Sequence, residues 1–350
     1  MTAGTETTTL RTQTVSLVVA AMLLGALPAF GLSNQLLQLF ALAFLLAIPA
    51  AGLSLLYGEG GQMSVASGAL YGVGAYVAAI GAREHVLTFW LALPVAAGAA
   101  AVAATLVGLT ALRVRGHYFL ILTFAFAELF RITMVNLRPL TGGNQGVMVL
   151  EPVTVPGIGE IESLRAFYFL GLAATLLAAF IVVLLRCSTF GRSLRAVREN
   201  ERLAVSLGLN AARVRLVAFA ISGALAGAAG TLYAYNLKHV GPDLFGATTG
   251  IQIVLVLLIG GARSALGPLI GALLFSALPE LVNLDPITTQ ILYGFALIAI
   301  VLISPDGLVP RLASWLSAAL HWGRRNRGAG SAERRLAADC GEAAAPAPRP

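Results

Sequence analysis

Long apolar runs separated by short polar segments make up most of this chain. A helix needs about 20 consecutive apolar residues to cross the hydrocarbon core of a bilayer. Runs close to this length recur along the sequence and predict ten membrane-spanning helices, near residues 14–32, 35–57, 62–81, 88–112, 116–135, 166–186, 214–236, 248–262, 265–283 and 287–304. The third and the eighth are rich in glycine and other small residues. The predicted fold class is all-α, a polytopic transmembrane helix bundle of about ten helices.

Composition supports a membrane location. Hydrophobic residues make up 58% of the 350 residues and charged residues 11%, whereas a soluble domain carries about 25% charged residues. The formal net charge of +7 is compatible with nucleic-acid binding. However, nearly all the basic residues are arginines in short clusters between apolar runs, which is typical of topology signals and not of a binding face. We therefore expect membrane lipid as a partner, and no nucleic acid.

The distribution of arginine predicts the orientation of the helices. Three regions are rich in arginine: the segment from Arg186 to Arg215, the loop at 113–115 and the tail after Arg311. The loop 136–165 instead carries more glutamate than arginine. Because positively charged loops stay in the cytoplasm, we expect the first three regions inside and the loop 136–165 outside. Ten helices then place both termini in the cytoplasm.

These assignments divide the chain into three parts. A short cytoplasmic N-terminus covers residues 1–13, and a transmembrane domain covers residues 14–323, with a cytoplasmic segment at 188–213 and an outer loop at 136–165. Residues 324–350 are small, polar and proline-bearing. Such a segment cannot bury enough apolar surface to offset its chain entropy, so we expect a disordered cytoplasmic tail.

Glycines at GxxxG spacing recur inside the apolar runs. This spacing lets two helix backbones approach closely within a membrane. The predicted contact positions are Gly68, Gly72, Gly223, Gly227, Gly267 and Gly271. The glycine-broken stretches at 58–74 and 260–271 lie in opposite halves of the chain, which suggests that they are corresponding elements of two internal repeats.

The segment 188–213 is too long for a tight turn and too regular for a disordered linker. Its apolar spacing predicts two short amphipathic helices that are hinged near Asn200 and end near Gly208. A charged helical loop of this kind is suited to docking a soluble partner. The alternative is a solvated, positively charged loop with a topological role only.

A few polar residues interrupt the apolar runs, and ionisable groups in a membrane are functional candidates by default. Glu128 and Arg131 are three residues apart and can pair on one helix face. They either face the partner subunit or the pathway, or form a structural ion pair near the outer end. A second group lies on or near one face of the third predicted helix and is expected either to line the translocation path or to make hydrogen bonds between helices: Gln62, Ser64, Ser67 and Tyr71, with Glu59 just before it.

Residue sets for catalysis or metal binding are lacking in the sequence. The only lysine is Lys238, so no GxxxxGK[ST] phosphate-binding loop is present. The four histidines are scattered, and Cys187 and Cys340 are too far apart for a CxxC pair. We predict no enzyme activity, no metal site and no cofactor, with any ATP bound by partner subunits.

Four blocks of sequence carry a resemblance to a known family. They are GEGGQMSVASGALYGVGAY (58–76), RGHYFLILTFAFAELFRITMVNLRPLTGGNQGV (115–147), FGRSLRAVRENERLAVSLGLNAARVRLVAFAISGALAGAAGTLYA (190–234) and VLLIGGARSALGPLIGALLFSALPEL (256–281). In content and order they resemble the permeases of branched-chain amino acid ABC transporters over residues 35–305. The RGxYF…LTGG block makes the chain most similar to the LivM-type subunit. The chain departs from the family at SVASGAL, where a histidine is common.

The resemblance implies an ABC importer in a bacterial inner membrane. The chain would pair with a homologous second permease subunit and work with two cytoplasmic ATPase subunits and an extracytoplasmic substrate-binding protein. The loop containing TGGNQG would face that binding protein or cap the pathway; the alternative is an ordered outer loop with turn chemistry only. The segment 190–210 would be the ATPase-coupling helix, with contact residues at Arg195, Arg198, Glu199, Asn200, Glu201, Ala204 and Gly208.

The cargo implied by the resemblance is a branched-chain or related amino acid. Urea or a short amide is the alternative within the same class of importer. The alternative from another class is an ion-coupled secondary carrier or channel, which would be expected to place a carboxylate mid-membrane. Glu128 is the main candidate for such a group in this chain.

Overall fold

The computed structural model describes residues 3–30, 33–112, 114, 117–149, 152–155, 159–161 and 163–282, with isolated residues 288, 294 and 295. The predicted tenth helix at 287–304 and the predicted tail at 324–350 therefore lie outside the described residues, apart from these isolated positions. The arginines of the loop at 113–115 and of the C-terminal tail also lie outside them.

Long helices dominate the described part of the chain and correspond to the first nine predicted spans. They are α1 (Ala3–Ala26), α2 (Asn34–Gly58), α3 (Ser67–Arg83), α4 (Phe89–Ala111), α5 (His117–Asn136), α7 (Leu164–Cys187), α10 (Ala211–Leu237), α11 (Ala247–Gly260) and α12 (Gly267–Val282). Six helical stretches in the described residues are long and apolar enough to cross a membrane; five fall in α2, α4, α5, α7 and α10, and the sixth joins the 3-10 turn η3 (Pro242–Leu244) to α11. The fold is thus a mostly helical membrane protein.

Short elements fill the connections. Three are short helices: α6 (Arg138–Thr141), α8 (Thr189–Glu199) and α9 (Glu201–Ser206). Two further 3-10 turns are η1 (Leu27–Phe30) and η2 (Gly143–Gln145). The strands are β1 (Val147–Met148), β2 (Val153–Val155), β3 (Gly159–Ile161) and β4 (His239–Val240). They form two antiparallel pairs, β1 with β4 and β2 with β3. These strands of two or three residues lie in the connections, and the described part of the chain is mostly helical.

Helix α3 begins later than the sequence pattern suggested. The predicted third span started at residue 62, but the structure leaves residues 61–64 without regular secondary structure and starts the helix at Ser67. Gly61 adopts φ +70°, a backbone conformation that residues other than glycine rarely adopt. The chain therefore turns away from the direction of α2 at this residue. The amide of Val65 then donates to the hydroxyl of Thr123 on α5 (3.2 Å). The break is therefore held by a side chain from a distant helix.

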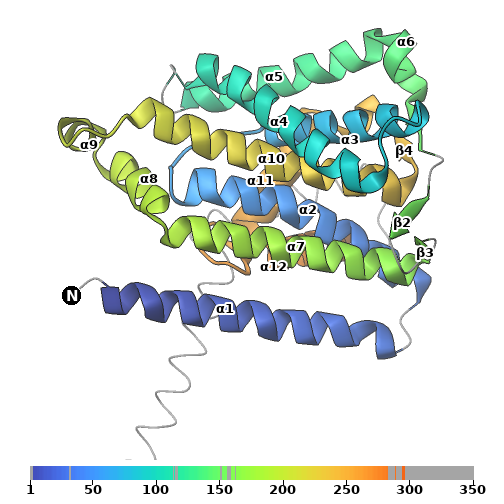
Figure 1. Ribbon diagram of the computed structural model, residues 1–350, viewed down its shortest axis with the longest axis horizontal. Helices are drawn as coiled ribbons and strands as arrows, with labels where there is room; N and C mark the ends of the chain where they lie inside the picture. The colour runs from blue at the N-terminus through green and yellow to red at the C-terminus, as the bar shows by residue number, and fades with distance from the viewer. Residues whose placement is uncertain are drawn as a thin grey trace, which may run out of the picture.

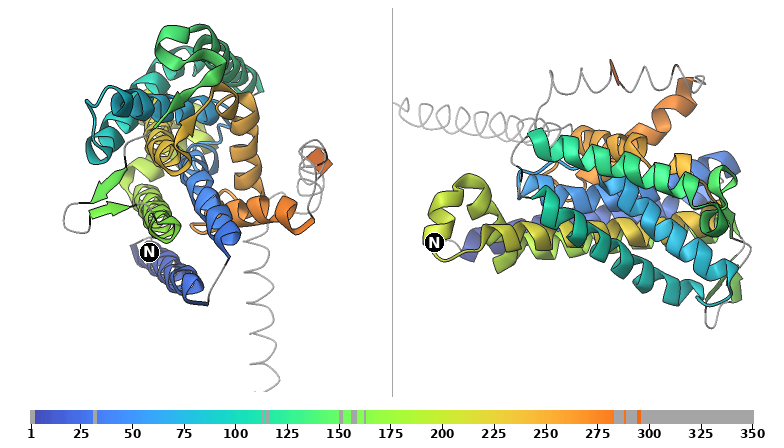
Figure 2. Two further views of the ribbon diagram at one scale, coloured as in Figure 1. Left: turned by 90° about the vertical axis from the view of Figure 1, so that its right-hand side faces the viewer. Right: turned by 90° about the horizontal axis from the view of Figure 1, so that it is seen from above.

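The helices run back and forth between two ends of the bundle (Figure 1). One end carries the start of α1, the break between α2 and α3, helices α8 and α9, and the break at 261–266 between α11 and α12. We call it the α8–α9 end. The other, the strand end, carries α6 and the four strands. The view from above in Figure 2 shows α8 and α9 extending beyond the rest of the described bundle.

Helix α10 is the centre of the packing. It contacts α2, α3 and α4, while α1 lies at the edge and packs mainly against α7 (Figures 1 and 2). A Cβ added to Gly223 or Gly227 would run into α4, and one added to Gly230 would meet the backbone of α3. Small residues therefore allow these helices to touch backbone to backbone, as in other membrane bundles.

The other glycines expected at helix contacts also have close neighbours. A Cβ at Gly68 would meet the backbone of α11, and a Cβ at Gly72 would meet the rings of Phe245 and Phe130. A Cβ at Gly271 would meet the backbone of α11, while one at Gly267 would meet the loop just before it.

At the strand end, Lys238 closes α10 in the left-handed conformation (φ +55°) and its side chain is exposed. The TGGNQG turn of the predicted outer loop packs here. A Cβ on Gly146 would clash with the carbonyl of Val240 in β4. The loop and the end of α10 therefore form one ordered unit.

Candidate coupling site

Helices α8 and α9 form the hinged pair that the sequence predicted. The hydroxyl of Ser188 caps α8, and the backbone N–H of Asn200 ends that helix by donating to the carbonyl of Ala196. The side chain of Asn200 caps α9 by accepting from the amide of Leu203 (3.1 Å). Asn210 caps α10 in the same way. Gly208 follows α9 with φ +89°, in open space. Its role in the structure is to allow this turn.

The pair is anchored by a small apolar contact. Leu194 and Val197 of α8 are buried, and Ala204 of α9 packs with Val197 and Ala211 at the start of α10. Ala204 is 2% exposed, so a larger side chain at this position would separate α9 from its neighbours.

Three apolar side chains of α9 and its last turn are exposed, beside the exposed polar residues Arg202 and Ser206. Leu203, Val205 and Leu207 are 57%, 52% and 76% exposed. The pair α8–α9 that carries them extends beyond the rest of the described bundle (Figure 2). A contiguous exposed apolar patch is a candidate protein interaction site. The sequence pattern had used these residues only as evidence of helix formation. Leu203 and Leu207 are four residues apart and share one side of α9, whereas Val205 lies on another side. Glu199 is also exposed, at the last position of α8.

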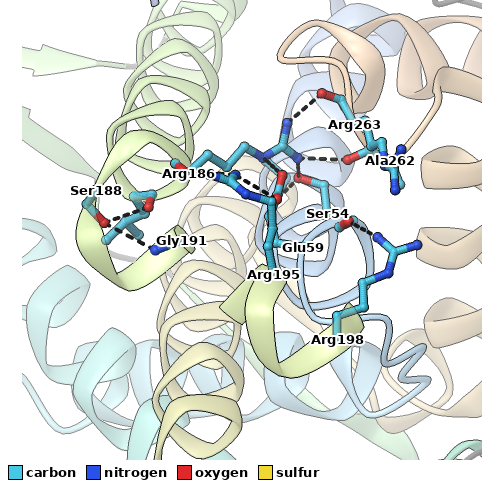
Figure 3. Close-up of polar contacts among 12 residues, drawn as sticks. Ser54, Glu59, Arg186, Ser188, Gly191, Arg195, Arg198, Ala262 and Arg263 are labelled. Carbon is cyan, nitrogen blue, oxygen red and sulfur yellow. Dashed lines mark hydrogen bonds and ion pairs between the residues drawn. The ribbon is translucent and has the colours of Figure 1, made fainter. Parts of the chain in front are cut away.

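The inner face of α8 is charged and points at the end of α2 (Figure 3). Arg195 donates to the carboxylate of Glu59, with 3.0 Å between Nη1 and Oε2. Arg198 donates to the carbonyl oxygen of Gly58, the last residue of α2. Both guanidinium groups therefore bind this chain's own backbone and side chains. The sequence had suggested these two residues as contacts for the ATPase and gave no sign of these bonds within the chain.

Glu59 lies between two arginines. Its residue is 7% exposed, and its second carboxylate oxygen lies 3.6 Å from Nε of Arg186 in the last turn of α7. Glu59 was a candidate for the translocation path in the sequence, but the structure places it in this ion-pair cluster. A buried carboxylate needs such partners, because a charge left without them in a low-dielectric site is costly.

Arg186 is the most heavily bonded member of the cluster. It is 4% exposed, and it donates to the carbonyls of Arg263 (2.9 Å) and Ala262 (2.8 Å) and to the hydroxyl of Ser54 (2.7 Å) (Figure 3). The sequence pattern indicated Arg186 only as a positive charge that sets topology. Its acceptors could not be predicted because they come from segments far apart in the chain.

Glu201 also binds within the chain. Its carboxylate pairs with Arg215 of α10 at 3.0 Å. Beside this pair lies a polar cavity of about 420 Å³, lined by Tyr57, Gly60, Gly61, Gln62, Arg198, Glu201 and Arg215. The structure thus brings Gln62, a candidate for the path, next to residues of the coupling segment.

The remaining candidates for the path do not share one face. Ser64 is buried in the break and accepts from the amide of Ala66 (3.2 Å), while Ser67 starts α3. Tyr71 is 2% exposed and its ring packs edge-on against Tyr233 and Phe245. The predicted alignment of these residues with Gln62 along one helix was wrong, because the helix starts only at Ser67.

Glu128 lies on α5 and pairs with Arg131 as its spacing predicted. The closest oxygen and nitrogen are 2.6 Å apart, and Arg131 also reaches Asp243 of η3 at 3.1 Å. About a third of each side chain in the Glu128–Arg131 pair is exposed. The carboxylate of Glu128 is therefore neutralised by a fixed neighbour.

Comparison with known proteins matches the sequence of this chain to a family. The family model described as the permease component of the branched-chain amino acid transport system matches residues 35–302. The chain belongs to this family. It is a multi-pass permease of the inner membrane and a component of a branched-chain amino acid transport system.

Individual relatives support the LivM-type resemblance. The permease is 29% identical to the high-affinity branched-chain amino acid transport system permease protein LivM of Escherichia coli, over 84% of this chain and 74% of that protein. It is 27% identical to LivH of the same organism, over 76% of this chain and 91% of that protein. The ribose import permease protein RbsC of Bacillus subtilis matches over 47% of this chain at 30% identity. No solved structure matches the chain.

Proposed function

We propose that the permease forms half of the translocation path of an ABC importer for branched-chain or related amino acids. It pairs with a homologous permease, receives cargo from an extracytoplasmic binding protein and is driven by two cytoplasmic ATPase subunits that bind the ATP. The chain itself is not an enzyme. Its α8–α9 end lies in the cytoplasm together with both termini, and ten helices cross the membrane.

The exposed face of α9 carries this proposal. Leu203, Val205 and Leu207 are apolar side chains whose exposure to water is unfavourable. They belong to a helix pair that is held against α2 and α10 by hydrogen bonds and ion pairs. A partner that docks on this face can therefore act on the helices behind it. Asn200 and Gly208 shape the face by setting the hinge and the exit turn.

Two features favour an ATP-driven importer over an ion-coupled carrier. The main intramembrane carboxylate, Glu128, is already paired with Arg131, whereas an ion-coupled carrier needs a carboxylate that is free to exchange its ion. A carrier also has no need of a docking surface like that of α9. The choice between amino acids and amides is made by the binding protein, so urea or a short amide remains the alternative cargo.

Co-purification tests the proposal. The permease is expressed with its partner subunits, purified in mild detergent and probed for a P-loop ATPase. Leu207→Asp places a charge on the exposed face and is expected to reduce the retained ATPase at least about tenfold, since a charge at the core of an apolar interface costs more than about 1.4 kcal/mol.

Val86→Asp is the matched control, because Val86 is 71% exposed at the opposite end of the bundle. It is expected to keep the ATPase. Absence of any ATPase from the parent complex, with and without nucleotide, would refute the importer.

A further inference from the structure

We infer that Glu59, held between Arg186 and Arg195, is the joint through which movement of α8 reaches both glycine-broken segments of the permease. This inference rests on the proposed function. It concerns the step after ATPase docking, and it assigns Glu59, Arg186 and Arg195 as positioning residues and not as contacts for the ATPase or the cargo.

The first step in the argument is the location of Glu59. It is the first residue after α2 and begins the break that leads to α3. Its carboxylate receives one arginine from α8 and one from α7. A displacement of α8 therefore acts directly on the start of the first break.

The second step is the reach of Arg186. Through Ala262 and Arg263 it holds the second break, between α11 and α12, and through Ser54 it holds α2. The two breaks also touch, since a Cβ on Gly58 would meet the carbonyl of Ala262. Arg186 thus fastens the two breaks to each other, and they respond as one unit.

The third step is the difference in burial between the two arginines. The side chain of Arg186 is 5% exposed, whereas that of Arg195 is 39% exposed. A buried group with several hydrogen bonds stays in place, while a pair open to solvent exchanges its partner at lower cost. Arg195 is therefore the part of the joint that moves with α8, and Glu59 with Arg186 is the part that receives the movement.

The arrangement also explains why α8 carries arginines on its inner face. An apolar contact alone would let α8 slide over the end of α2, because apolar packing is non-directional. Charge-assisted hydrogen bonds from Arg195 and Arg198 fix both the position and the direction of the contact. Movement is then transmitted without loss of register.

The test compares transport with ATP consumption in the complete complex, reconstituted in liposomes with the binding protein. Arg195→Gln, Arg195→Lys and the control Arg192→Gln are assayed for ATPase retention, ATP hydrolysis and uptake of radiolabelled leucine. Arg192 lies on the same helix at an exposed position, and its Nη1 donates to the carbonyl of Cys187 (3.4 Å).

Arg195→Gln is expected to retain the ATPase and to hydrolyse ATP at no less than half the parent rate. Its uptake per ATP should fall about tenfold, a change within the range of coupling free energies between sites. Arg195→Lys, which keeps the charge, should recover uptake per ATP to within about twofold of the parent. The control should match the parent. A loss of packing alone would reduce hydrolysis and uptake together, so this ratio reports coupling.

Equal uptake per ATP in Arg195→Gln and the parent would overturn the joint, as would a failure of Arg195→Lys to exceed Arg195→Gln. Neither result touches the proposed function, provided that the ATPase is retained. If the parent complex retains no ATPase, the proposed function itself fails, and the two failures are therefore distinguishable.

Discussion

At the scale of single residues, the permease buries two opposite charges near the α8–α9 end, where Arg186 and Glu59 are both withdrawn from water. Burying an ion pair adds little stability, because the cost of desolvation offsets the attraction. Removing one member is different, since it leaves the other charge buried without compensation. Arg186 also donates hydrogen bonds to two carbonyls and a hydroxyl, so its loss leaves these three groups without that donor at once.

Replacing Arg186 therefore tests this cluster. Arg186→Met is expected to lower the free energy of unfolding by about 3 kcal/mol, since it leaves Glu59 with Arg195 alone. Arg186→Lys should fall between this variant and the parent, because an ammonium keeps the charge but lacks the planar fork of donors. The measurement is the apparent melting temperature in mild detergent.

The comparison variant is Arg192→Met at an exposed position of α8, which should stay within about 0.5 kcal/mol of the parent. Equal melting of Arg186→Met and Arg192→Met would show that the buried cluster is not a source of stability.

At the scale of elements, backbone contact between helices organises the bundle. Gly227 on α10 faces Ala96 and Ala100 on α4 so closely that a Cβ has no room. Gly98 lies on α4 as well, but a Cβ added there meets nothing within 4 Å. The same substitution therefore has opposite meanings at these two positions.

Gly227→Ala is expected to destabilise the permease by about 2 kcal/mol through overpacking. Gly98→Ala should be neutral or slightly stabilising, by up to about 0.5 kcal/mol, because alanine is the better helix former. Thermal unfolding of the two variants in the same detergent measures both effects. If Gly227→Ala has the same melting temperature as Gly98→Ala, α4 and α10 are farther apart than the structure places them.

Apolar run length predicted the existence and order of the helices well, because only helices satisfy the backbone in lipid. Helix ends were harder. The start of α3 at Ser67 depends on Gly61 and on a hydroxyl from α5, and no local pattern contains that information. The pairing of Glu128 with Arg131 was predictable because both lie on one helix, whereas the partners of Arg186 and Glu59 were not.

The two glycine-broken segments are related in position, since each joins two helices and both lie at the α8–α9 end. This arrangement is in keeping with the hypothesis of two internal repeats. The hypothesis stays a prediction, and superposition of α2–α3 on α11–α12 would test it.

At the scale of the whole molecule, the alternation of helices fixes which connections share a side. The start of α1 and the pair α8–α9 lie at one end, and Val86 and the strands lie at the other (Figure 1). The proposed orientation puts the first end in the cytoplasm, in agreement with the arginine bias.

Cysteine labelling tests this orientation. In a background with Cys187→Ser and Cys340→Ser, Val86→Cys and Leu207→Cys replace side chains of similar exposure, 71% and 76%. A membrane-impermeant maleimide is expected to label Val86→Cys in intact spheroplasts and Leu207→Cys only in inside-out vesicles. The reverse pattern would invert the topology and place α9 out of reach of any ATPase.

The single lysine, at the end of α10, has a practical consequence. Lys238 is exposed. In the sequence it follows the helices of the coupling segment and precedes those around the second break. A protease specific for lysine therefore has one cleavage site in the whole chain. One cut would yield two pieces, residues 1–238 and 239–350, each with its own glycine-broken segment, and the bonds of Arg186 to Ala262 and Arg263 would then join two separate polypeptides.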